Sequence, residues 1–182
     1  MANYPDTLLR ECRSSLALRS GAAVLFGIAC LWPNTLLIQL FACFAFVDGI
    51  LTLSSGGWVL SRRSVWPLLI GGCIDLVIAA TAYTWSGMTL VGLLNLLTVW
   101  AFALGTTFTV AAATLRGADR DCLLLLSGIA SGLFARALLT YTAADIVVIS
   151  TWTGLYGITI GILFLKLTLQ QYPLVALDLS VE

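Results

Sequence analysis

Six long, uninterrupted apolar stretches are the feature of this 182-residue sequence that most restricts its fold. A helix needs about 20 apolar residues to cross a bilayer core about 30 Å thick. Strands of an outer-membrane barrel are alternating segments of only about 10 residues, which these unbroken runs exclude. We therefore predict an all-α polytopic membrane protein with six transmembrane helices. The predicted spans are Leu16–Leu31, Thr35–Gly56, Val65–Tyr83, Met88–Leu115, Cys122–Tyr141 and Asp145–Lys166.

Composition agrees with a membrane protein and removes several function classes. Hydrophobic residues make up 60% of the chain and charged residues 10%, against about 25% charged in soluble domains. Nine basic residues balance nine acidic ones, so no basic field attracts nucleic acid. The chain has no histidine, and its five cysteines form no Cys-x-x-Cys motif. We predict no catalytic residues, no metal and no cofactor, with the cysteines as small buried apolar residues.

The connections between spans predict the orientation of the chain in the membrane. Two connections, 61–64 and 115–120, contain all four loop arginines, whereas the other three contain no Lys or Arg. Arg10 and Arg13 precede the first span. Because basic loops stay in the cytoplasm, we predict that both termini are cytoplasmic. An aromatic belt at the span ends supports the boundaries; its members are Trp32, Trp66, Tyr83, Trp85 and Tyr141.

The ends of the chain lie outside the predicted six-helix domain, which covers residues 16–167. Residues 1–15 form a cytoplasmic leader, either an interfacial helix or a frayed polar segment, and residues 168–182 form a cytoplasmic tail. Arg10, Arg13 and Arg19, grouped as basic residues upstream of the first apolar run, also fit a signal peptide. No small-x-small cleavage site follows, so we predict a retained span.

Glycines divide the domain into three hairpin repeats at roughly 16–60, 65–116 and 121–167. Gly21, Gly71 and Gly128 lie near the starts of the odd-numbered spans. Aligning these glycines places Pro33, Tyr83 and Thr140 at the outer turns. Three further glycines then recur late in the even-numbered spans, at Gly49, Gly105 and Gly161.

The first hairpin resembles the HdeD-like family of small bacterial inner-membrane proteins. The resemblance rests on Phe-Gly-Ile-Ala-Cys-Leu-Trp-Pro at 26–33 and Phe-Ala-Phe-Val-Asp-Gly-Ile at 44–50. The later hairpins depart from it: their turns lack the proline, and Leu104 and Ile160 replace the aspartate. The resemblance implies a non-enzymatic inner-membrane protein associated with stress and acid resistance, acting through membrane assembly. The expected partners are the lipid bilayer and, in a homo-oligomer, further copies of the chain.

We single out three charged residues of the predicted spans as functional candidates: Asp48, Asp75 and Arg136. Each costs at least about 2.5–3.5 kcal/mol in hydrocarbon and should face protein or water. They form either a structural ion pair or a proton or ion relay. The relay would make the protein a small channel or transporter for an unidentified solute. We expect Arg136 to turn towards the bundle and pair with Asp75; the alternative is that it snorkels outward to Asp145.

A stripe of small residues predicts where the last two spans pack. Small side chains let helix backbones approach closely in lipid. We therefore predict that these glycines face protein rather than lipid, through packing within the chain or between subunits. They are Gly128, Gly132, Gly154, Gly157 and Gly161.

Overall fold

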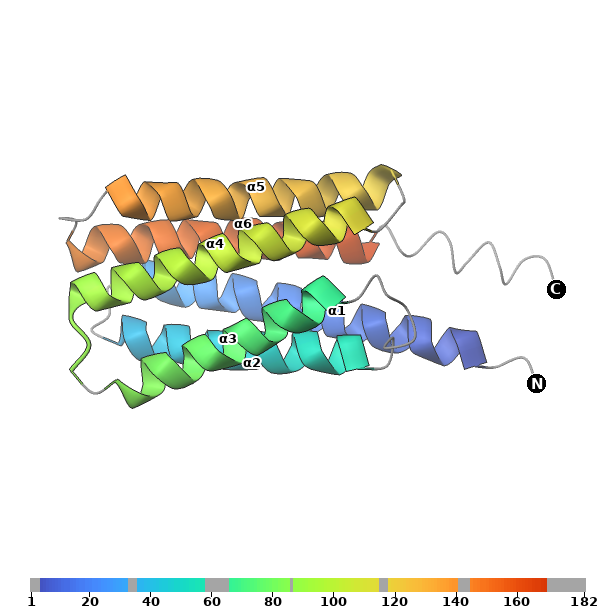
Figure 1. Cartoon of the computed structure of the whole chain (residues 1–182), viewed down its shortest axis with the longest axis horizontal. Helices are drawn as coiled ribbons and strands as arrows, with labels where there is room; N and C mark the ends of the chain where they lie inside the picture. The colour runs from blue at the N-terminus through green and yellow to red at the C-terminus, as the bar shows by residue number, and fades with distance from the viewer. Residues whose placement is uncertain are drawn as a thin grey trace.

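The structure of the chain, a computed structural model, is an elongated helical bundle (Figure 1). It describes residues 4–32, 36–57, 66–85, 87–114, 118–140 and 145–169. This part of the chain contains six helices and no strand. The helices are α1 (Tyr4–Leu31), α2 (Leu37–Gly57), α3 (Trp66–Thr84), α4 (Leu90–Thr114), α5 (Ala118–Thr140) and α6 (Ile146–Leu169).

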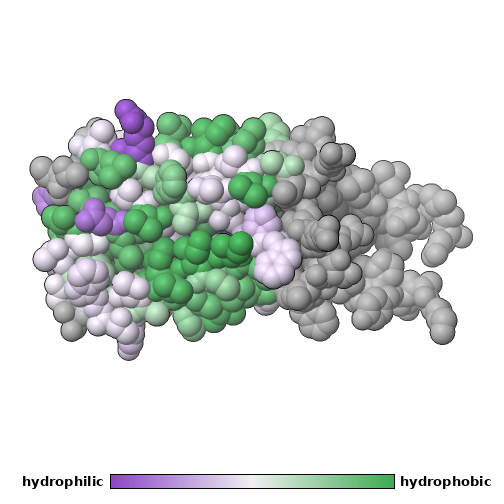
Figure 2. Space-filling view, in the orientation of Figure 1, coloured by the Kyte–Doolittle hydropathy of each residue, from purple (hydrophilic) through white to green (hydrophobic). Residues whose placement is uncertain are grey.

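The helices are those of a membrane protein, and the all-α prediction is confirmed. Five helices (α1, α2, α4, α5 and α6) are long and apolar enough to cross a bilayer. The apolar run of α3, Leu69–Thr84, is shorter. A broad apolar band covers the middle of the visible face (Figure 2), as expected for a surface that contacts lipid.

The helix bounds differ from the predicted spans mainly at the two ends of the chain. α1 begins at Tyr4 and continues through the leader into the first span without a break. α6 ends at Leu169, and the remainder of the predicted tail lies outside the described residues. Arg62, Arg63 and Arg116 of the basic connections also lie outside them, whereas Arg120 lies in the first turn of α5.

The six helices form a closed ring in which the first helix meets the last. Each helix contacts its neighbour along the chain, and α6 returns to pack against α1. The contacts alternate in extent around the ring. The most extensive are α1 with α6, α2 with α3, and α4 with α5, whereas the two helices of each predicted hairpin contact each other less.

Paired glycines explain two of the three extensive contacts. Between α2 and α3, a Cβ atom added to Gly49 would lie 3.0 Å from the carbonyl oxygen of Gly72. Between α4 and α5, a Cβ on Gly105 would lie 3.1 Å from the carbonyl oxygen of Gly128. The absence of a side chain at these positions therefore allows the backbones of neighbouring helices to touch.

The contact between α1 and α6 uses one glycine on α1 and a stripe on α6. A Cβ on Gly27 would lie 2.7 Å from the carbonyl oxygen of Gly154, and one on Gly157 would lie 3.1 Å from the Cα of Gly27. A turn further, a Cβ on Gly161 would lie 2.6 Å from Cγ2 of Val24. α1 and α6 thus join along several turns and close the ring.

Gly132 differs from the other glycines of the predicted stripe. Gly128, Gly154 and Gly157 pack against neighbouring helices, but a Cβ on Gly132 would have no atom within 4 Å, and the residue is exposed. Its backbone nitrogen approaches Gly105, while a side chain at this position would meet open space. The prediction that Gly132 faces protein is therefore corrected, because only its backbone lies at the contact.

The glycine contacts predict opposite effects for two matched substitutions. Gly27→Ala should lower the free energy of unfolding by about 1–3 kcal/mol, because its methyl group meets the backbone of α6. Gly132→Ala should leave stability unchanged or raise it by about 0.5–1 kcal/mol, because helix propensity alone changes. Thermal denaturation in detergent measures both. Equal losses in the two variants would contradict the close contact between α1 and α6.

Candidate functional site

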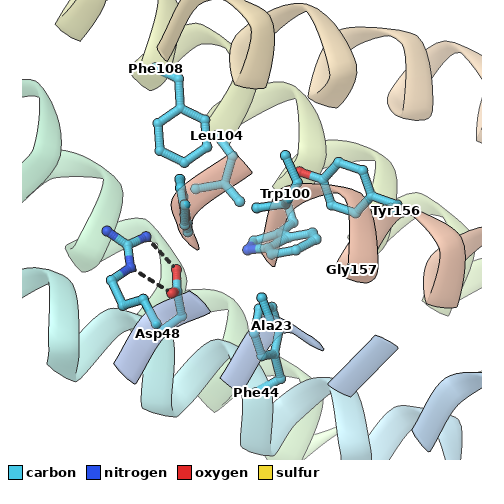
Figure 3. Close-up of a pocket in the computed structure, with 11 residues that line it drawn as sticks. Ala23, Phe44, Asp48, Trp100, Leu104, Phe108, Tyr156 and Gly157 are labelled. Atoms are coloured by element: carbon cyan, nitrogen blue, oxygen red, sulfur yellow. Dashed lines mark hydrogen bonds and ion pairs between the residues drawn. The ribbon is translucent and has the colours of Figure 1, made fainter. Parts of the chain in front are cut away.

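The centre of the ring contains a buried pair of opposite charges. Arg19 of α1 and Asp48 of α2 are 5% and 3% exposed. The guanidinium donates from Nε to Oδ1 and from Nη2 to Oδ2 of the carboxylate, both at 2.8 Å (Figure 3). Two parallel charge-assisted hydrogen bonds are among the stronger polar contacts in proteins. This geometry fixes the rotation of α1 relative to α2.

Neighbouring groups hold both members of the pair. The Arg19 guanidinium carbon lies 5.0 Å from the centre of the Phe164 ring of α6, in cation–π geometry. Within α2, the hydroxyl of Thr52 donates to the backbone carbonyl of Asp48 at 2.7 Å. The pair is therefore removed from lipid by three helices, α1, α2 and α6.

A second carboxyl group, that of Asp75 on α3, lies in the same polar cluster. Asp75 is fully buried, and Oδ1 accepts a 2.8 Å hydrogen bond from Nε1 of Trp100 on α4. Its carboxyl group interacts electrostatically with Arg19 and with Asp48. Oδ2 has no hydrogen-bond partner among the described residues. The cluster thus brings together one guanidinium and two carboxyl groups.

Aromatic side chains fill the bundle beside this cluster. Phe44 of α2, Trp100 of α4 and Tyr156 of α6 each lie five residues before one of the glycines that recur late in the even-numbered spans. The Trp100 ring meets those of Phe44 and Tyr156 edge-on, with centroids 5.9 Å apart in both pairs. The Tyr156 hydroxyl shares a 2.7 Å hydrogen bond with Ser131 of α5. Equivalent positions on the even-numbered helices therefore form one aromatic layer.

The space left between these groups is very small. A cavity of about 10 Å³ lies between the Arg19–Asp48 pair and the aromatic layer. Leu104, Phe108 and Ile160 also line it. A single buried water needs about 10–15 Å³, so the cavity has room for about one water molecule. This cavity has no space for a larger solute.

The structure unites two of the three charged residues predicted from the sequence. Asp48 and Asp75 lie in one cluster, whereas Arg136 of α5 is exposed on the outside of the bundle. The donor to Asp75 is Trp100 rather than Arg136. The expectation that Arg136 turns inward to pair with Asp75 is therefore corrected.

From the sequence, Arg19, the arginine of the cluster, is grouped with the basic residues upstream of the first apolar run and is not predicted as a site residue. The distance of Arg19 from the connection between α1 and α2 could have identified it as the partner of Asp48. Arg19 lies 12 residues before Leu31, and Asp48 lies 11 residues after Leu37, the ends of α1 and α2 that face one connection. At about 1.5 Å per residue, both side chains lie about 17–18 Å from the turn. Opposite charges at one depth on adjacent helices predict an ion pair.

The burial of the cysteines differs from the prediction. Cys30 is buried, but Cys43, Cys73 and Cys122 are exposed, so the prediction that cysteines are buried is corrected for these three. The side chain of Cys12 lies outside the described residues. No group of three or more metal-binding side chains occurs in the described part of the chain.

A double-mutant cycle measures the coupling of the central pair. Arg19→Leu or Asp48→Leu alone should lower the free energy of unfolding by about 3–5 kcal/mol, because each leaves an unpaired buried charge. The double variant should lose less than the sum of the two single losses. The measurement is the fraction of protein that stays folded on heating in detergent. Arg136→Leu is the matched control, and we expect it to lose little stability. Additive losses would show that the two charges are not coupled.

Comparisons with known proteins leave the chain without an assigned family. No family model matches it, and no curated protein and no solved structure matches it either. The resemblance of residues 26–50 to the HdeD-like family therefore stays a prediction.

Proposed function

We propose that this protein is a non-enzymatic membrane protein with six spans that acts through assembly in the bacterial inner membrane. A role in stress or acid resistance forms part of the proposal through the HdeD-like resemblance. The observation that carries the proposal is the filled centre of the bundle. With the centre of the described helices filled by side chains, the outer surface is the part that meets lipid and other proteins.

The filled centre argues against a solute path. In the aromatic layer, the ring of Trp100 contacts both Phe44 and Tyr156 across the ring of helices. The adjacent cavity has room for about one water molecule. A path for a larger solute would require rearrangement of the aromatic layer.

The outer surface, by contrast, is rich in large apolar side chains. Examples lie on several helices, such as Leu25 at 70%, Phe102 at 68% and Leu133 at 64% exposed. Lipid tails and apolar faces of other membrane helices are the partners that such a surface accepts. This surface supports action through lipid contact and helix association.

Two features support six spans arranged as three hairpin repeats. The extent of helix contact alternates around the ring with a period of two helices. Phe44, Trp100 and Tyr156 each lie five residues before the glycine that recurs late in their span. The shorter α3 contributes Asp75 to the same central cluster as its neighbours, as expected of a helix that passes through the bilayer with them.

The proposed orientation has both termini in the cytoplasm. The start of α1 and the end of α6 lie at one end of the bundle (Figure 1), and Arg120 lies in the first turn of α5. At the ends of α1 and α3, Trp32, Tyr83 and Trp85 are exposed. Exposed aromatic residues at helix ends fit the membrane interface, and basic connections fit the cytoplasmic side.

A second candidate function is a channel or transporter whose polar path passes Asp48 and Asp75. The buried carboxyl groups favour it, because intramembrane ionisable residues often mark ion or proton paths. Arg136, the third residue of the predicted path, is exposed on the outside of the bundle. The two candidates differ in whether the purified protein conducts ions.

Reconstitution of the full chain in liposomes separates the two functions. We expect proton and monovalent-ion flux equal to that of empty liposomes, and subunit counting should give assemblies larger than one 19.4 kDa chain. Liposomes with Asp75→Asn protein are the matched control for flux. Flux that the wild type shows and this variant loses would favour the transporter. Monomers throughout would contradict action through assembly.

A further inference from the structure

Among the charged residues of the central cluster, Asp75 has a fully buried side-chain oxygen without a hydrogen-bond partner among the described residues. Asp48 uses both carboxylate oxygens to accept from Arg19. Asp75 accepts from Trp100 through Oδ1, while Oδ2 is buried without a hydrogen-bond partner. A buried polar atom without a partner costs about 1–3 kcal/mol, and more when the group is charged. The arrangement therefore needs a further donor or a bound ligand at Oδ2.

The charges of the cluster identify the missing ligand as a cation. With both carboxyl groups ionised, Asp48 and Asp75 outnumber Arg19 and leave one negative charge at the centre of the bundle. Two ionised carboxylates are acceptors only, so neither donates a hydrogen bond to the other. Burying an unpaired charge is strongly unfavourable in an apolar interior. One additional positive charge would both neutralise the cluster and supply a donor.

The groups that interact with Asp75 favour a proton over a metal cation. They are Arg19 from α1, Asp48 from α2, Trp100 from α4 and the phenol of Tyr156 from α6. Helix α4 contains no ionisable side chain, and Arg136 of α5 is exposed. No three metal-binding side chains gather in the described part of the chain. A metal cation would therefore lack ligands, whereas a proton needs only two oxygens.

We propose that Asp75 is a proton-binding site, in which Oδ2 holds a proton and donates it towards the Asp48 carboxylate. The proton comes from water, and no bond between heavy atoms forms or breaks. Both oxygens of Asp48 accept hydrogen bonds from Arg19, and each has a lone pair left to accept from Asp75. Oδ1 serves as the carbonyl oxygen that accepts from Trp100. The protonated cluster is neutral.

The bound proton makes the stability of the protein depend on pH with a defined sign. An aspartate in an unfolded chain is ionised above about pH 4. The folded state then holds one more proton than the unfolded state, so stability falls as pH rises. The protein is therefore stabilised by acid in this range, independently of how it acts on the membrane.

Infrared spectroscopy of the purified full chain in lipid tests the proposal. We expect the carbonyl band of a protonated carboxylic acid at about pH 7, where exposed carboxylates are ionised. Asp75→Asn should abolish this band. The matched control, Asp145→Asn, changes an exposed carboxylate at the start of α6 and should leave the band unchanged. A wild-type spectrum without the band at about pH 5–7 would overturn the proposal.

A second variant keeps the test decisive if Asp75→Asn fails to fold. Trp100→Phe removes the donor to Oδ1, so the carbonyl band should shift to higher frequency without disappearing. A band that does not move in Trp100→Phe, or that only Asp48→Asn abolishes, would place the proton elsewhere and overturn the assignment to Asp75. Thermal stability should fall in wild type as the pH rises above about 5. That slope should be absent in Asp75→Asn, and an equal slope in both proteins would also overturn it.

Discussion

Close backbone contact at glycines is the interaction on which the rest of this structure depends. Lipid tails are as apolar as leucine side chains, so helices in a bilayer gain little from burying apolar surface against one another. Gly27 with Gly157, Gly49 with Gly72 and Gly105 with Gly128 bring the backbones of neighbouring helices together. The contact at Gly27 matters most, because it joins the first helix to the last and closes the ring.

Closure of the ring creates the environment of the polar cluster. Arg19 reaches Asp48 in the interior only because α6 covers α1 on the other side, where Phe164 lies against the guanidinium. A buried ion pair adds little net stability compared with well-packed apolar side chains, but it is costly to break. The pair therefore contributes to the register of α1 against α2, while the glycine contacts hold the ring together. The unmatched carboxyl oxygen of Asp75 is the part of the centre that packing leaves unexplained, and a bound proton accounts for it.

The sequence predicted the helical class, the approximate helix positions and two residues of the cluster. Apolar runs of span length locate helices in lipid without any knowledge of packing. A buried aspartate such as Asp48 or Asp75 is likewise conspicuous in an apolar run. The faces of the helices were harder to predict, because helices that are apolar on all sides give no period that marks the inner face.

Helix rotation explains why Arg136 lies outside the bundle while Gly154 and Gly161 share one inner face. At 3.6 residues per turn, a step of four residues advances about 40° around a helix and a step of three falls back about 60°. Gly128 and Arg136 are two four-residue steps apart, so the stripe rotates by about 80° and leaves Arg136 outside. Gly154 and Gly161 are separated by one step of each kind, so they differ by only about 20° and stay on the face that meets α1.

Contact between α1 and α6 in a lipid bilayer tests the account most directly. Solid-state NMR of the unmodified, isotope-labelled protein can detect a through-space contact between the Cα atoms of Gly27 and Gly157. Residues so close in space and so distant in the sequence should give a direct cross-peak, as should Gly105 with Gly128 across α4 and α5. A Gly105–Gly128 peak without a Gly27–Gly157 peak would mean that the ring is open. The buried charge cluster would then lose the cover that the account requires.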